Sequence, residues 1–146
     1  MEKKETIGLI KKTIEKFCES FDKKDWMMMN ECLMENIYVD YSSFRKTTPG
    51  NISAKEFIEL RKTGLQHLTT KHQTNNFQIT FNNEQATCEC DFVIQRFDDS
   101  GKYFHSYGHY TFLLSEKNDA CKIESITQVV LKNEGDSAIH GAFLGK

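Results

Sequence analysis

The sequence predicts an α+β domain, with helices concentrated in its first half and a long antiparallel meander in its second. Apolar residues recur every three or four positions in the N-terminal third, which is typical of amphipathic helices. From Thr69 onward they alternate with polar residues, which is typical of strands. The 146 residues suit one domain spanning 1–146, and no repeat, low-complexity segment or domain linker divides them.

Two helices are predicted at the N-terminus. The first carries one apolar stripe, with Lys and Glu on its other side, formed by Ile7, Ile10, Ile14, Phe17 and Phe21. The second, shorter helix is expected to open at Asp22 and to run through Met34.

A strand and a third helix follow. In "IYVDYS" the alternation places Ile37, Val39 and Tyr41 on one face of a strand. The stretch "KTTPGN" then interrupts the chain. "SAKE" at 53–56 is a capping box, so a third helix is predicted to start at Ser53 and to run to about Gln66.

The last part of the chain predicts four long strands separated by the turns "NNE", "DDSGK" and "EKND". Such strands exceed the usual five or six residues. We therefore expect a curved sheet around a helix, with an interior lined by Phe, Met, Trp and Tyr that forms an apolar pocket. The alternating residues are Phe77, Ile79 and Phe81, then Cys88, Cys90, Phe92 and Ile94, then Phe104, Ser106, Gly108, Tyr110, Phe112 and Leu114.

Composition excludes several classes of function. The apolar fraction is 38%, the charged fraction 27% and the net charge −2, which favours neither nucleic acid nor a membrane surface as partner. The N-terminus is too charged for a signal peptide, and five scattered Cys read as reduced thiols. These features predict a cytoplasmic protein.

No metal or cofactor site is predicted. Cys88 and Cys90 lie two apart, and His67 and His72 lie five apart, and neither spacing is a usual zinc pattern. Phosphate-binding loops and nucleophile elbows are absent from the sequence as well.

The candidate catalytic residues are His72 and Asp22. Histidine suits proton transfer near neutral pH, and a carboxylate commonly fixes its tautomer. Both residues also have structural explanations: a lone His at a strand start is usually structural, and Asp22 in "DKKD" could simply cap a helix. Asp40 is another carboxylate, but it alternates to the face opposite Tyr41.

Two stretches resemble a known family. "FCESFDKKDWMMMNECLMENIYVDYSSF" and "LTTKH" are similar to the scytalone dehydratase and SnoaL-like branch of the nuclear-transport-factor-2-like (NTF2-like) superfamily. The resemblance implies a curved α+β cone with an internal pocket and cofactor-free elimination chemistry. It also implies that His72 is the base, that Asp22 is its partner and that Tyr41 holds a water against a substrate carbonyl.

The chain departs from that family pattern in its polar substrate contacts. A second Tyr is replaced by Phe21, a second pocket His by Ile94, and polar residues of a late strand fall near Gly108 and Tyr110. These departures predict either a small, less polar cyclic substrate or no chemistry at all. The predicted pocket walls are Phe21, Trp26, Ile94 and Tyr110.

Two hypotheses follow from the sequence. In the first, the protein is a cofactor-free lyase or isomerase that uses the His72–Asp22 pair and Tyr41. In the second, it is a non-catalytic small-ligand carrier or dimerisation module, whose sheet pairs through its outer face as a homodimer. Tyr107, His109 and Gln128 would then be polar groups of the dimer interface. The C-terminal stretch "DSAIHGAFLGK" either closes the cone or is disordered.

Overall fold

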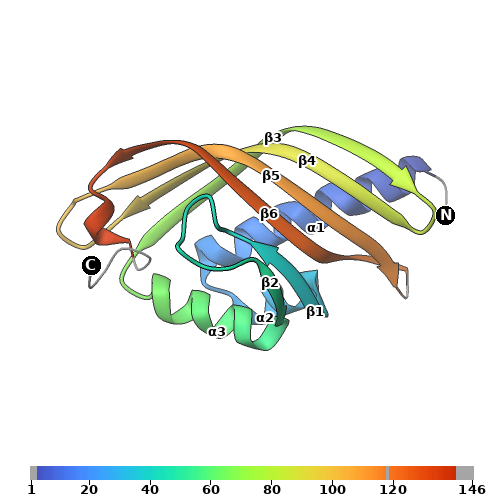
Figure 1. The fold of residues 1–146 in the computed structure, drawn as a ribbon, viewed down its shortest axis with the longest axis horizontal. Helices are drawn as coiled ribbons and strands as arrows, with labels where there is room; N and C mark the ends of the chain where they lie inside the picture. Colours follow the sequence, from blue (N-terminus) through green and yellow to red (C-terminus); the bar gives the residue numbers. More distant parts are fainter. Residues whose placement is uncertain (1–2, 118, 141–146) are drawn as a thin grey trace.

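The computed structural model describes residues 3–117 and 119–140, and they form the predicted α+β arrangement (Figure 1). Three helices pack against one sheet, and a short 3-10 helix follows the last strand. In chain order the elements are α1 (Lys3–Lys23), α2 (Trp26–Cys32), β1 (Leu33–Asp40), β2 (Gly50–Ser53), α3 (Ala54–Leu65), β3 (Thr69–Asn82), β4 (Gln85–Phe97), β5 (Phe104–Lys117), β6 (Ala120–Gly135) and η1 (Ser137–Ile139).

The sheet has six strands in the order β2-β1-β6-β5-β4-β3. β1 pairs in parallel with β6, and the other neighbours are antiparallel. The strands β3 to β6 are 13 to 16 residues long and curve over the helices, which lie on one side of the sheet (Figure 1). This confirms the predicted long meander and encloses an interior.

The apolar stripe of α1 supplies much of the core. Ile10, Ile14, Phe17 and Phe21 are buried, as predicted, whereas Ile7 is only half-buried. The Phe17 ring meets the Phe112 ring of β5 edge-on, with the ring centroids 6.0 Å apart. Burying each such side chain contributes about 1.5–3 kcal/mol.

The predicted boundary between the first two helices is wrong. Asp22 lies in the last turn of α1, and Lys24 ends this helix with a φ of 53°. Asp25, three residues later, caps α2 by accepting a hydrogen bond from the Met28 N–H at 3.1 Å. The helix cap in "DKKD" is therefore Asp25, which leaves the Asp22 carboxylate available for another contact.

The short strand β2 was not predicted. It pairs with β1, placing Ile52 opposite Ile37. Its sequence "GNIS" is too short and polar to show alternation, so tertiary pairing decides its conformation. By contrast, the Ser53 hydroxyl caps α3 by accepting from the Glu56 N–H at 3.1 Å, which confirms the predicted start of this helix.

None of the described helices is long and apolar enough to cross a membrane. All five cysteines are buried with free thiols, and Cys88 and Cys90 are fully enclosed in the core.

Candidate functional site

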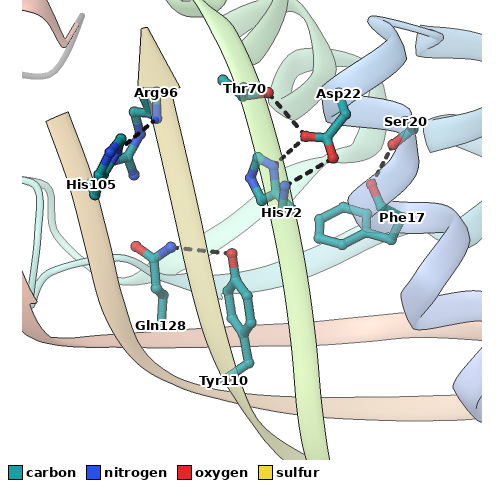
Figure 2. Close-up of polar contacts among 9 residues, drawn as sticks. All are labelled: Phe17, Ser20, Asp22, Thr70, His72, Arg96, His105, Tyr110 and Gln128. Atoms are coloured by element: carbon teal, nitrogen blue, oxygen red, sulfur yellow. Dashed lines mark hydrogen bonds and ion pairs between the residues drawn. The ribbon is translucent and has the colours of Figure 1, made fainter. Parts of the chain in front are cut away.

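Asp22 and His72 are in direct contact (Figure 2). The Oδ1 atom of Asp22 lies 2.6 Å from Nδ1 of His72, and Oδ2 accepts the His72 backbone N–H at 2.8 Å. The Thr70 hydroxyl donates to the same Oδ1 at 3.0 Å. A carboxylate held by three donors fixes the ring plane, and it requires the proton of a neutral His72 to sit on Nδ1.

A β-bulge turns His72 inward. The pairing of β3 with β4 shifts between Asn75 and Gln78, and Asn76 has a φ of 56°. The extra residue changes the alternation, so His72 points to the same side as the half-buried Phe77 and Ile79 farther along β3. Without this bulge, the period of two would put His72 on the opposite face.

Burial keeps the imidazole neutral. The His72 side chain is only 5% exposed, and desolvation lowers its pKa below the usual 6.5. The Asp22 hydrogen bond opposes this shift, and the positive charge of Arg96 adds to it. The Phe21 ring stacks on the imidazole, with centroids 4.7 Å apart. His72 thus presents an unprotonated Nε2 at neutral pH.

His72 lines a small interior cavity of about 30 Å³. That volume holds about two waters. Figure 2 shows Asp22 on one side of the imidazole and Arg96, Tyr110 and Gln128 on the other. The lining residues are Phe21, Tyr41, Phe44, Arg45, Arg61, Leu65, Thr70, His72, Ile94, Arg96, Tyr110, Gln128 and His140.

Three polar atoms of the cavity residues are buried without a hydrogen-bond partner among the described residues. They are the Tyr41 hydroxyl, Nε of Arg45 and Oε1 of Gln128. A buried polar group without a partner costs about 1–3 kcal/mol, so native structures rarely keep several in one place. All three belong to residues that line this one cavity.

Tyr41 and three of the four predicted wall residues line this cavity, the three being Phe21, Ile94 and Tyr110. Burial raises the pKa of Tyr41, so its hydroxyl keeps its proton at neutral pH, although nearby Arg61 opposes the shift. Trp26 is the exception. It begins α2 beyond the Asp25 cap, is half-buried and packs against the hydrophobic core instead of the cavity.

Gln128 is also placed differently from the prediction. It is 4% exposed and faces the cavity, where its amide donates to the Tyr110 hydroxyl at 3.2 Å. Tyr107 and His109 lie on the other face of the sheet. The pairing of β5 with β6 shifts between Leu113 and Leu114, and this bulge moves Gln128 inward. Gln128 therefore does not share the outer face with Tyr107 and His109, as the dimer hypothesis required.

Sequence reasoning missed the arginines of the cavity. The position of Arg96 could have been predicted, because it continues the inward alternation of Phe92 and Ile94 along β4. No sequence pattern predicts the position of Arg45. A tight turn directs it inward, in which the Tyr41 carbonyl accepts a hydrogen bond from the Arg45 N–H at 2.8 Å. The cavity lining is therefore more polar than the departures from the family pattern predicted.

The last described residues of the C-terminal stretch also reach the cavity. His140 is 2% exposed and packs edge-on against the Phe44 ring, with centroids 4.9 Å apart. His67 contacts the Ile139 carbonyl through Nε2 at 2.7 Å, which anchors η1 beside the end of α3. The rest of the predicted closing segment, 141–146, lies outside the described residues.

Within residues 3–117 and 119–140, no three His, Cys, Asp or Glu side chains converge as a metal site would require. The dyad has one carboxylate and one imidazole, and all five thiols are buried in the core. The groups at the site that can transfer a proton or carry charge are the His72–Asp22 pair and the arginines of the cavity lining.

Comparison with known proteins places this chain in a family. A model described as a SnoaL-like domain matches residues 3–127. The scytalone dehydratase-like protein AacuK of Aspergillus aculeatus is 24% identical over an alignment 108 residues long, and the match covers 65% of this chain. The matched region spans only 61% of that relative's length.

Solved structures share the fold at low sequence identity. The Kfla4162 protein of Kribbella flavida has a TM-score of 0.87 at 12% identity, and the match covers 91% of this chain and 95% of that one. A type 2 hexachlorocyclohexane dehydrochlorinase (LinA) has a TM-score of 0.77 at 11% identity, with coverage of 92% and 91%. These likenesses show that the fold is the NTF2-like α+β cone.

Proposed function

The chain belongs to the SnoaL-like domain family, and from this premise we propose that it is a cofactor-free lyase or isomerase acting on a small cyclic compound. The observation that carries the proposal is the contact of Asp22 with His72 at 2.6 Å, on the wall of a cavity with unpartnered polar atoms. The similarity to a scytalone dehydratase-like protein supports the same class of reaction.

His72 is the general base in this proposal. Asp22 occupies Nδ1, so the lone pair of Nε2 accepts a proton from a substrate carbon beside a carbonyl. Its lowered pKa ensures that the base is unprotonated at neutral pH. As the imidazolium forms, the neighbouring Asp22 carboxylate stabilises its charge.

Tyr41 supplies the oxyanion contact. When the C–H bond breaks, its electron pair moves toward the carbonyl oxygen, which becomes an enolate. The Tyr41 hydroxyl, buried and protonated, is a donor without a partner among the described residues and can stabilise that oxygen directly or through a water.

Elimination or isomerisation then completes the cycle. In elimination, the enolate electrons form a C=C bond and expel a hydroxyl from the next carbon, which leaves as water with the proton of His72. In isomerisation, His72 returns the proton to another carbon. Either outcome restores neutral His72 without an external oxidant or reductant.

The second candidate function is a non-catalytic binding module. It is favoured by the small volume of the cavity, about 30 Å³, because side chains fill most of the cone. Substrate entry in the catalytic proposal therefore requires side chains of the lining to move. Outer-face dimerisation of the sheet and a cytoplasmic location stay predictions.

Deuterium exchange tests the proposal on a panel of model substrates. Small cyclic ketones and β-hydroxyketones, both neutral and acidic, are incubated in D₂O and followed by NMR. We expect the wild type to exchange or eliminate at least one of them, and His72→Gln to lower the rate by about 10²–10⁴-fold.

His109→Gln is the matched control, because His109 lies on the outer face of β5 between Glu89 and Asp91. It should retain the wild-type rate. Equal rates in wild type and His72→Gln would contradict the proposal, and saturable binding without exchange would support the binding module.

A further inference from the structure

All three arginines of the chain line the same cavity. The sequence has 19 Lys and Arg residues, but its only arginines are Arg45, Arg61 and Arg96, and each of them faces the interior beside His72. They come from the loop after β1, from α3 and from β4. Lys residues are absent from the lining. Three separate segments thus place the same side chain at one point.

These arginines have no acidic partner among the described residues. The ion pairs of the described chain involve Lys or His and none of the arginines. The lining contains no carboxylate, and Asp22, behind His72, is already held by three donors. Buried charges are normally paired, so an anion would stabilise the buried Arg61 and Arg96 and the half-buried Arg45 beside them.

Their other contacts orient the guanidinium groups without neutralising them. Arg61 stacks over the Tyr41 and Phe57 rings, at 4.6 Å and 4.2 Å from the centroids. Arg96 donates to the Ser106 hydroxyl at 2.8 Å and lies 5.2 Å from the Phe44 ring. Such stacking holds the planar fork in place for a bidentate contact.

Burial lowers the pKa of two arginines of the cluster, and for Arg45 the neighbouring positive charges add to the shift. Burial, followed by the charge of Arg61, lowers the pKa of Arg45 to about 10. Burial lowers the pKa of Arg96 to about 10 as well. Both groups stay protonated at neutral pH and would be stabilised by a bound negative charge.

An outer groove adjoins the cavity. It has a volume of about 470 Å³ and runs along α3, β2 and the preceding loop. Tyr41, Arg45 and Arg61 line both the groove and the inner cavity, so these three side chains form the wall between them. The charged side chains that line the groove are Arg45, Arg61 and Glu56, and its two arginines belong to the wall that it shares with the cavity.

We propose that the natural ligand of this site is a small organic carboxylate, bound by Arg45, Arg61 and Arg96 with its apolar part against Phe21, Leu65 and Ile94. This rests on the proposed function for the claim that the ligand is transformed, but binding itself does not require turnover. It replaces the uncharged, less polar substrate expected from the sequence. A carboxylate fits better than a larger oxyanion, because the planar guanidinium fork matches it and the cavity is small, at about 30 Å³.

Matched acids and amides test the proposal on the full chain. Acetate and benzoate are compared with acetamide and benzamide by calorimetry, while the arginine Nε–Hε resonances are followed by NMR. We expect each acid to bind at least tenfold more tightly than its amide and to shift the Arg45 resonance. Equal affinity of acid and amide, or no binding of either acid, would overturn the proposal.

Substitutions locate the bound charge. Arg45→Met should weaken benzoate binding at least tenfold, and Lys46→Met, which removes an exposed charge next to it in the same loop, should leave the affinity within twofold. Arg61→Lys keeps the charge but loses the fork, and we expect a smaller loss of affinity than in Arg45→Met. Unchanged affinity in Arg45→Met would contradict the assignment, and the wild-type NMR shifts decide the matter if a variant fails to fold.

Failure of this inference can be distinguished from failure of the proposed function. If the protein turned over only neutral ketones and bound no carboxylate, the carboxylate proposal would be contradicted. The proposal that His72 is a general base would still stand. Tight carboxylate binding in wild type and in His72→Gln, without exchange or elimination of any acid, would support the ligand class and contradict the catalytic proposal.

Discussion

The Tyr41 hydroxyl is a single buried group that lowers the stability of the folded protein. It is buried with no hydrogen-bond partner among the described residues, while its ring packs edge-on against Phe57 with centroids 6.2 Å apart. Such a group costs free energy in the folded protein. Its retention is explained if a ligand supplies the missing partner.

Tyr41→Phe should therefore separate stability from activity. We expect the free energy of unfolding to stay equal or to rise by about 1 kcal/mol, because the unpartnered hydroxyl is removed while the ring contacts remain. Turnover of any substrate found should fall by about 10²–10³-fold through loss of the oxyanion donor. Urea denaturation and steady-state kinetics on the same samples measure both effects.

A variant that is clearly less stable, yet fully active, would contradict this account of Tyr41. The hydroxyl would then be a structural group, satisfied by a contact such as a bound water, and Tyr41 would have no part in the chemistry.

Strand β5 depends on close packing at Gly108. A Cβ atom there would lie 2.0 Å from the Val129 carbonyl oxygen and 2.8 Å from the Phe92 ring. Gly108 sits where the pairing of β5 with β6 shifts, on the inward face that leads to Tyr110. Because the backbone of β6 approaches so closely, position 108 requires a residue without a side chain.

Gly108→Ala should destabilise the protein by about 1–3 kcal/mol, since rigid backbone and a buried ring must both move. Gly64→Ala is the matched control, because nothing lies within 4 Å of its added Cβ in helix α3. There Ala should stabilise by up to about 1 kcal/mol. Urea denaturation of both variants checks the prediction, and equal midpoints would refute the packing argument.

At the scale of the whole molecule, two buried histidines make the fold sensitive to acid. Burial lowers the pKa of His140 to about 2, with the charges of Arg96, Arg45, Arg61 and His67 adding to the shift. The pKa of His72 is lowered as well. In the unfolded chain both groups return to about 6.5.

The unfolded state therefore binds more protons than the folded state below pH 6.5. Stability is complete above that pH and falls as the pH drops, with a slope that approaches about 1.4 kcal/mol per pH unit from His140 alone. Urea denaturation at pH 7, 6 and 5 should show this loss, and His140→Gln should reduce the slope. An unchanged slope in that variant would show that folded His140 accepts a proton freely.

The sequence predicted the class of fold because its two periodicities are strong. The three- and four-residue spacing of α1 and the alternation of β4 and β5 reappear in the structure. Strand β2 escaped prediction, because "GNIS" carries no pattern and its conformation comes from pairing with β1.

Prediction of the site depended on resemblance more than on local pattern. The resemblance paired Asp22 with His72, and the structure brings the two together. Alternation alone would have placed His72 outward, because the bulge at Asn75 is invisible in the sequence. Arg45 and Arg61 were missed because they lie in a turn and a helix that are distant in sequence from Asp22 and His72. Only the folded chain brings them to the cavity.

The central claim is that Asp22 holds His72 as a neutral base, and NMR titration of the His72 ring in wild type and Asp22→Asn tests it most directly. We predict a wild-type pKa below 6.5 with the proton on Nδ1. In Asp22→Asn the pKa should fall further, because the carboxylate is the group that raises it. A His72 that titrates near 6.5 in both proteins, with no preferred tautomer, would contradict the account.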